Sequence, residues 1–96
     1  MIRHLVFFKF KPAVPAEQKN AAVNRLRALP AKIPVIGEYQ IGEDVLRSPR
    51  SWDVALVSVF ESLETLQQYQ VHADHVAAAR ELHEICESMA SVDFPF

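Results

Sequence analysis

Two stretches of the chain show the apolar alternation of β-strands, and in both of them each face of the strand is apolar. The first runs from Arg3 to Phe10 and is rich in β-branched and aromatic residues, as strands are. One face carries Ile2, His4, Val6, Phe8 and Phe10, and the other carries Arg3, Leu5, Phe7, Lys9 and Lys11. The second stretch runs from Trp52 to Phe60 and places Trp52, Val54, Leu56 and Phe60 opposite Ala55, Val57 and Val59. Both faces of such strands are expected to pack against other apolar groups, because exposed apolar patches of this size are rare in soluble monomers.

Between these strands lies a helical segment followed by a weaker strand. Ala16 to Leu29 has apolar residues three and four positions apart, which predicts an amphipathic helix that ends at Pro30. Val35 to Val45 then has the composition of a strand, with a bulge or bend expected at Gly37 and Gly42.

The C-terminal third is mainly helical. Ser62 is a suitable N-cap for a helix that runs to Tyr69, and a further helix begins near Asp74. Its apolar stripe consists of His75, Ala79, Leu82, Cys86 and Met89. We expect a short last strand from Ser91 to Phe96.

This order of elements predicts one α+β domain over residues 1–96 with a ferredoxin-like, four-stranded antiparallel sheet. The helices can cover only one face of such a sheet. The other face would expose Leu5, Phe7, Ala55, Val57 and Val59. A twofold homodimer that packs sheet against sheet, closing an α+β barrel, would cover it.

Composition narrows the class of protein. The formal net charge is −2 and there is no basic run, so we expect neither nucleic acid nor a membrane surface as a partner. No apolar run approaches the roughly 20 residues of a membrane span, and the N-terminus lacks the apolar core of a signal peptide. The single cysteine, Cys86, excludes an intrachain disulfide and fits a reducing compartment. We therefore expect a cytoplasmic protein.

The candidate chemistry lies in the stretch from Tyr69 to Val76, which holds a phenol and two imidazoles. His75 falls on the apolar stripe at a helix N-terminus, where burial and the helix dipole both disfavour the imidazolium. A neutral His75 could take a proton from a carbon acid while the Tyr69 hydroxyl polarises a carbonyl oxygen. The alternative is structural, with His75 capping a turn and Tyr69 filling the core.

The same reasoning predicts a small-ligand pocket between sheet and helices. Strand alternation points His4 toward the helices, where it either joins the pocket or is satisfied by a backbone group. Besides His75 and Tyr69, we expect the pocket to contain His4, Val6, Phe8, Val23, Leu26, His72, Ala79 and Leu82. The suitable ligand is a small carbonyl or aromatic compound.

Neither a metal nor a cofactor is expected. The spacing of His72 and His75 suits a metal, but zinc needs three or four ligands, and neither Cys86 nor a nearby carboxylate is placed to complete the shell. The chain has no glycine-rich phosphate loop and no haem attachment motif.

Several short motifs together resemble the stress-responsive dimeric α+β barrel (Dabb) family. They are His4-Leu5-Val6, Phe8-Lys9-Phe10-Lys11, Gly42-Glu43-Asp44, Asp53-Val54-Ala55-Leu56-Val57, Phe60-Glu61-Ser62, Tyr69, His72, Asp74-His75-Val76 and Val92-Asp93-Phe94. The resemblance implies a ferredoxin-like protomer whose dimer closes a β-barrel. It implies no reaction, because most members have none assigned.

One member of that family is a polyketide cyclase that uses a histidine base and a tyrosine. By resemblance, these two positions fall on His75 and Tyr69, and a histidine near the N-terminus of the cyclase falls on His4. A further pocket histidine of the cyclase falls on Val54, so this chain lacks it. Bulky aromatics of its first helix fall on Ala22, Val23 and Leu26, and a later tryptophan falls on Cys86. The resemblance therefore implies a less aromatic pocket of different shape.

Three functions stay open at this point. The chain is a ligand-binding domain without turnover, a cofactor-free cyclase, isomerase or lyase acting through His75 and Tyr69, or a structural dimer whose cavity is filled by side chains. We favour the first.

Overall fold

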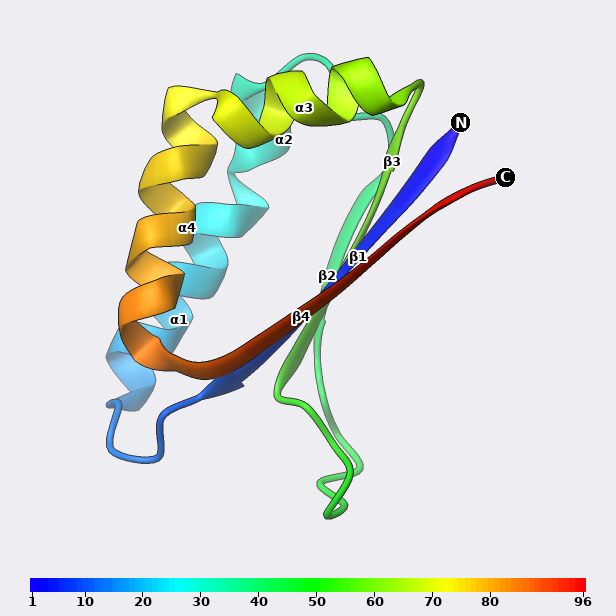
Figure 1. The fold of residues 1–96 in the computed structure, drawn as a ribbon. Coiled ribbons are helices and arrows are strands. Elements are labelled where there is room, and N and C mark those ends of the chain that lie inside the picture. Colours follow the sequence, from blue (N-terminus) through cyan, green and yellow to red (C-terminus); the bar gives the residue numbers. More distant parts are fainter.

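The computed structural model describes all 96 residues, with the helices gathered on one side of a sheet (Figure 1). The element order is the predicted one, including the pair of helices in the C-terminal third, except that the single helix predicted after the first strand is split in two. The elements are β1 (Ile2–Phe10), α1 (Ala16–Arg27), α2 (Leu29–Lys32), β2 (Tyr39–Glu43), β3 (Val54–Phe60), α3 (Leu63–Val71), α4 (Ala73–Ile85) and β4 (Cys86–Pro95). No helix is both long enough and apolar enough to cross a membrane.

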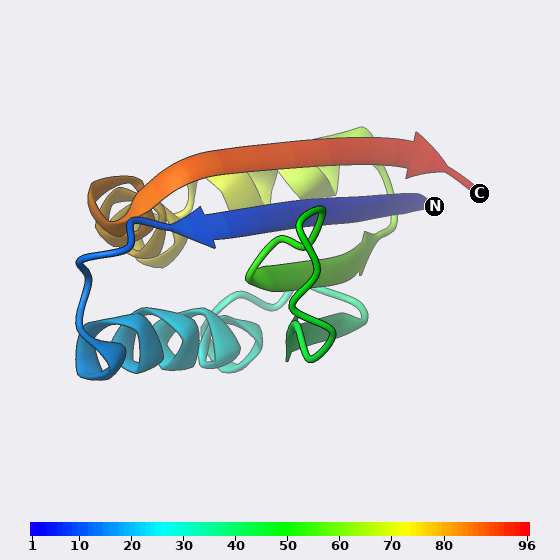
Figure 2. The same cartoon turned by 90° about the horizontal axis from the view of Figure 1, so that it is seen from below.

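The four strands form one antiparallel sheet in the order β2-β3-β1-β4. β1 is therefore a central strand, and Leu5 pairs with Val57 on one side and with Val92 on the other. Figure 2 shows β4 (orange to red) lying alongside β1 (blue) over the length of both strands. This is the ferredoxin-like α+β arrangement that the sequence predicts.

The core lies between the sheet and the helices. It consists of 17 buried residues, among them Phe8, Leu26, Leu56, Tyr69 and Leu82, each with at most 2 % of its surface exposed. Burial of these side chains is the main favourable contribution to folding.

No helix covers the opposite face of the sheet (Figure 1). Val59, predicted to be exposed on this face, is only 4 % exposed, because the segment around Gly37 lies against it. Leu5, Phe7 and Val57 on this face are only half-buried, and Val92 and Phe94 remain 55 % and 39 % exposed. The apolar character predicted for both faces is thus present, and one of the two faces is open.

Three element boundaries differ from the predicted ones. Pro30 does not stop helix formation but lies in the first turn of α2, where its missing N–H costs little. β2 is shorter than Val35 to Val45 because a turn precedes Tyr39 and the β2–β3 loop begins at Asp44.

The third difference affects the site. The stripe that ends in Cys86 and Met89 predicts a helix this far, but α4 ends at Ile85 and Cys86 already has extended backbone angles. Lys11 secures this end, because its backbone N–H donates to the Ile85 carbonyl at 2.8 Å and its Nζ donates to the Glu84 carbonyl at 3.0 Å. The last strand is consequently ten residues long rather than a short one.

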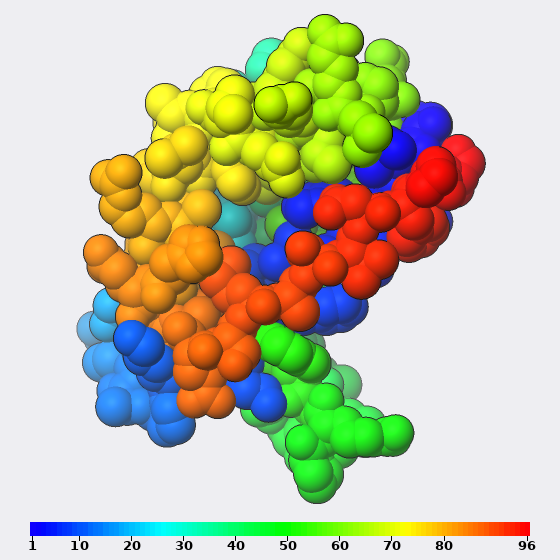
Figure 3. All heavy atoms as spheres, viewed as in Figure 1, coloured from blue at the N-terminus to red at the C-terminus, as the bar shows by residue number.

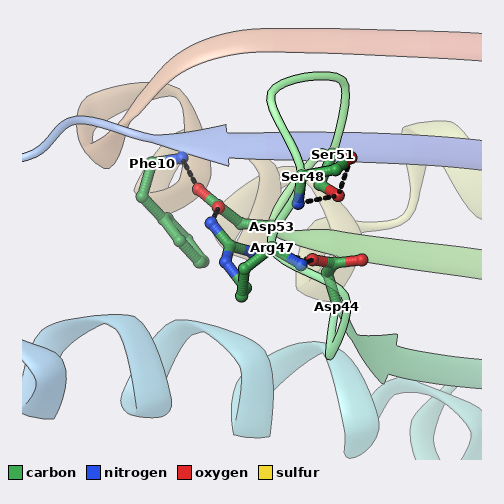
Figure 4. A network of polar contacts seen from close by, with 6 residues as sticks. All are labelled: Phe10, Asp44, Arg47, Ser48, Ser51 and Asp53. Carbon is green, nitrogen blue, oxygen red and sulfur yellow. Dashed lines mark hydrogen bonds and ion pairs between the residues drawn. The ribbon is translucent and has the colours of Figure 1, made fainter.

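The loop between β2 and β3, residues 44–53, projects beyond the sheet and is held by charged groups (Figure 4). Arg47 donates to Asp53 Oδ1 at 2.6 Å and to Asp44 Oδ2 at 3.3 Å, and Asp53 Oδ2 accepts the Phe10 N–H at 2.8 Å. Burial alone would raise the pKa of Asp53, but these hydrogen bonds, with the charges of Arg47 and Lys19, lower it. The loop is therefore tied to the end of β1.

Candidate functional site

A cavity of about 200 Å³ lies between the sheet and the helices. Figure 3 shows the hollow between α4 (yellow to orange) and β4 (orange to red), with blue atoms of β1 visible inside it. The cavity is open to solvent on one side. A small molecule would fill it, and a larger one would project through the opening.

The cavity brings together eight of the predicted residues. These are His4, Val6, Phe8, Leu26, Tyr69, His75, Ala79 and Leu82. Leu56, Gln70, His83, Met89 and Ser91 complete the lining. No Asp, Glu, Lys or Arg is among the lining residues, so the polar groups that face the cavity are imidazoles, hydroxyls and an amide.

His75 lies in the first turn of α4, and its surroundings determine both its tautomer and its charge. Its Nδ1 lies 2.9 Å from the carbonyl oxygen of Gln70, which can only accept, so Nδ1 carries the hydrogen. Burial lowers the pKa of His75, the hydrogen bond to Gln70 opposes this, and the nearby His4 and His72 lower it further. The ring is therefore neutral near pH 7, with Nε2 as a hydrogen-bond acceptor.

Tyr69 packs against His75 from α3. Their ring centroids are 4.3 Å apart, and the Tyr69 side chain is fully buried. Neither the Tyr69 hydroxyl nor the buried Tyr39 hydroxyl makes a hydrogen bond of good geometry within the chain, although the two hydroxyls lie close to each other. Burial raises the pKa of Tyr69 and the contact with Tyr39 opposes this, so the Tyr69 hydroxyl stays a neutral O–H donor. A buried hydroxyl without a partner is uncommon and favours a group that would pair with it.

His4 is the second imidazole in the cavity. It is 5 % exposed, and its Nδ1 pairs with the Asp93 carboxylate of the neighbouring strand. Its ring lies edge-on to Tyr69 and Phe60, with centroids 6.2 Å from each. Of the two roles left open for His4, the structure therefore favours a place in the cavity lining, because the partner of the ring is a side chain and not a backbone group.

Val23 and His72 lie outside the cavity lining. Val23 is a buried core residue of α1. His72 is the N-cap of α4, where its Nδ1 accepts the Asp74 N–H at 3.1 Å. The chain has no group of three or more His, Cys, Asp or Glu side chains that could hold a metal ion.

Asp93, Met89 and Ser91 were not among the predicted site residues. Their position depends on β4 beginning at Cys86, which brings Ser91 opposite Val6 and Asp93 opposite His4. Strand alternation could have placed Ser91 and Asp93 on one face of the last strand, but not opposite particular residues of β1. Gln70 contributes a backbone carbonyl, for which its side chain gives no sequence signal.

The fold and this helix-covered cavity define a ferredoxin-like α+β domain with a small pocket. Residues 2–96 match the family described as the stress-responsive A/B barrel domain, Dabb, and the chain belongs to that family. The family resemblance seen in the sequence is thereby confirmed.

Three similar proteins illustrate the range of the family. A dimeric ferredoxin-like protein of unknown function from Bacteroides fragilis is 39% identical, with a TM-score of 0.83 and coverage of 99% of this chain and 95% of that chain. Olivetolic acid cyclase of Cannabis sativa is 28% identical over 97% of this chain and 94% of its own length. A stress-response A/B barrel domain-containing protein of Arabidopsis thaliana is 30% identical over 98% of this chain, which spans only 36% of that protein.

Proposed function

We propose that this chain is a homodimeric domain that binds a small, uncharged carbonyl compound in the cavity between sheet and helices. The observation that carries the proposal is the buried Tyr69 hydroxyl, an O–H donor without a hydrogen bond of good geometry in the chain, next to the neutral ring of His75. The two rings are in contact, and the lining around them is largely apolar.

The absence of fixed charge in the lining argues for an uncharged ligand. A buried carboxylate would need a cationic partner, and no Lys or Arg lines the cavity. A ketone oxygen, by contrast, needs only the single hydrogen bond that Tyr69 can give.

The homodimer is supported by two observations. The similar protein from Bacteroides fragilis is dimeric, and the open sheet face of this chain exposes Val92 and Phe94. Packing two such faces together would cover them in the twofold manner usual for homodimers.

A second candidate function is proton transfer at the carbon next to the bound carbonyl. Imidazoles that line the cavity together with the Tyr69 hydroxyl are the components of general acid–base chemistry. Olivetolic acid cyclase shows that a similar protein is an enzyme.

Binding can be tested by titrating the ¹⁵N-labelled protein with butan-2-one and acetophenone and following its amide signals. The proposal expects saturable shifts at Gln70, His75 and Ala79, weakened at least about fivefold in Tyr69→Phe, which loses one hydrogen bond of about 1 kcal/mol. The proposal would be contradicted if neither ketone gave saturable shifts, or if Tyr69→Phe bound the ketones with the same affinity as the wild type.

A further inference from the structure

We propose that His4, held by Asp93, is the group that exchanges a proton with a carbonyl compound bound in the cavity, and that His75 stays neutral and packs beside the compound. This inference rests on the proposed function, because the compound must enter the cavity first. It goes further by assigning the proton to one of the imidazoles that line the cavity and by giving Asp93 a role as a positioning residue.

The sheet register brings His4 and Asp93 together. They are direct partners across β1 and β4, so both side chains leave the sheet on the same face. The Asp93 carboxylate pairs with His4 Nδ1. Because an ionised carboxylate can only accept, Nδ1 carries the hydrogen, and Nε2 on the other edge of the ring has its lone pair free. His4 lines the cavity and Asp93 does not.

The hydrogen-bond partners of His4 and His75 determine which of these two imidazoles can accept a second proton and become a cation. A base becomes a cation when it takes a proton, and a carboxylate beside it stabilises the imidazolium and fixes the tautomer. His4 has this partner in Asp93. His75 has only the Gln70 carbonyl, and it lies in the first turn of α4, where the helix dipole disfavours positive charge.

The proton transfer can be written without any other reactant. Nε2 of His4 takes a proton from the carbon next to the carbonyl, and the C–H electron pair forms the C=C bond of an enolate. The carbonyl π electrons move to the oxygen, to which the Tyr69 hydroxyl donates a hydrogen bond. In D₂O the His4 imidazolium exchanges with solvent and returns a deuteron to the carbon, so the compound becomes labelled.

The test is the rate of deuterium uptake by butan-2-one in D₂O, measured by NMR with the intact protein. We expect Asp93→Asn to lower kcat for exchange about a hundredfold, because the amide can donate to Nδ1 and so reverse the tautomer. Glu87→Gln makes the same chemical change at an exposed position of β4 and is expected to exchange like the wild type. Asp93→Glu, which keeps the carboxylate, recovers part of the rate. His75→Gln is expected to raise KM and to leave kcat within about threefold.

A spectroscopic measurement separates tautomer loss from misfolding. ¹⁵N shifts of the imidazoles should show His4 protonated at Nδ1 in the wild type and at Nε2 in Asp93→Asn, with His75 unchanged.

The outcomes distinguish this inference from the proposed function. If butan-2-one binds and no deuterium is taken up, the inference is overturned and the binding function stands. It is also overturned if His75→Gln abolishes exchange while Asp93→Asn exchanges normally. If neither butan-2-one nor acetophenone binds, both proposals fall.

Discussion

At the level of single residues, His75 shows how the fold selects a protonation state. Burial removes the water that would stabilise an imidazolium, and this effect outweighs the hydrogen bond to the Gln70 carbonyl. His72 and His4 add repulsion whenever they are charged. His75 is therefore a neutral imidazole in a cavity without Asp, Glu, Lys or Arg in its lining.

The lowered pKa of His75 makes stability depend on pH. Below the ordinary value of 6.5, the unfolded chain binds a proton at this position that the folded chain resists, so stability falls as pH decreases through this range. We expect Tm to drop between pH 7.5 and pH 5 by a greater amount in the wild type than in His75→Gln. His83→Gln, an exposed histidine of the same helix, serves as the control and should behave like the wild type. Equal drops in wild type and His75→Gln would contradict the assignment.

Sequence reasoning found most of the candidate site because periodicity fixes which side of an element a residue occupies. His4 follows from strand alternation, and Tyr69 and His75 follow from helical spacing. Asp93 escaped because its place depends on a register between β1 and β4 that no local pattern specifies. The burial of the Tyr69 hydroxyl beside that of Tyr39, without a hydrogen bond of good geometry, is likewise a property of the packed core and not of the sequence.

At the level of elements, the two glycines that both suggested a bend have different environments. A Cβ at Gly37 would lie 2.8 Å from the backbone oxygen of Val59, whereas a Cβ at Gly42 would meet nothing within 4 Å. The Gly37 N–H donates to that same Val59 oxygen at 2.9 Å, so the two segments cannot separate without losing this bond.

These environments predict that the same substitution to alanine changes stability at Gly37 but not at Gly42. Gly37→Ala should lower the free energy of unfolding by about 1–3 kcal/mol, as overpacking does. Gly42→Ala should stay within about 0.5 kcal/mol of the wild type. Urea denaturation measures the free energy of unfolding of both variants. Equal values for the two would contradict the close contact between Gly37 and the Val59 backbone.

The start of α3 gives a second prediction for an element. Ser62 Oγ accepts the Thr65 N–H at 3.2 Å and Thr65 Oγ1 accepts the Ser62 N–H at 3.1 Å, a reciprocal cap. Ser62→Ala should cost about 1 kcal/mol, or a Tm decrease of about 4–8 °C. Ser88→Ala, at an exposed position of β4, should change Tm little. A Tm for Ser62→Ala equal to that of Ser88→Ala would argue against the cap.

The C-terminal boundary shows what the sequence could not predict for an element. Leu82, Cys86 and Met89 continue a helical spacing, yet neither glycine nor proline marks the end of α4 at Ile85. The end is set by Lys11, a residue distant in sequence, which pairs with the last carbonyls of the helix. Such tertiary contacts override local pattern.

At the level of the whole molecule, the open sheet face determines the expected assembly. The proposed homodimer should have twice the 10.9 kDa mass of the chain in light scattering. Val57→Lys places a charge in the middle of this face and should yield monomers, while Val71→Lys makes the same change at an exposed end of α3 and should leave the dimer intact. A monomeric wild type would contradict the assembly.

Whether the cavity holds a carbonyl compound beside His75 and Tyr69 can be decided by a crystal structure of the protein grown with acetophenone. We expect ligand density inside the cavity, with the carbonyl oxygen within hydrogen-bond distance of Tyr69 Oη and the methyl carbon near His4. A cavity closed by movement of Phe8, Leu26 and Met89, with the Tyr69 hydroxyl bonded to the protein itself, would contradict this expectation.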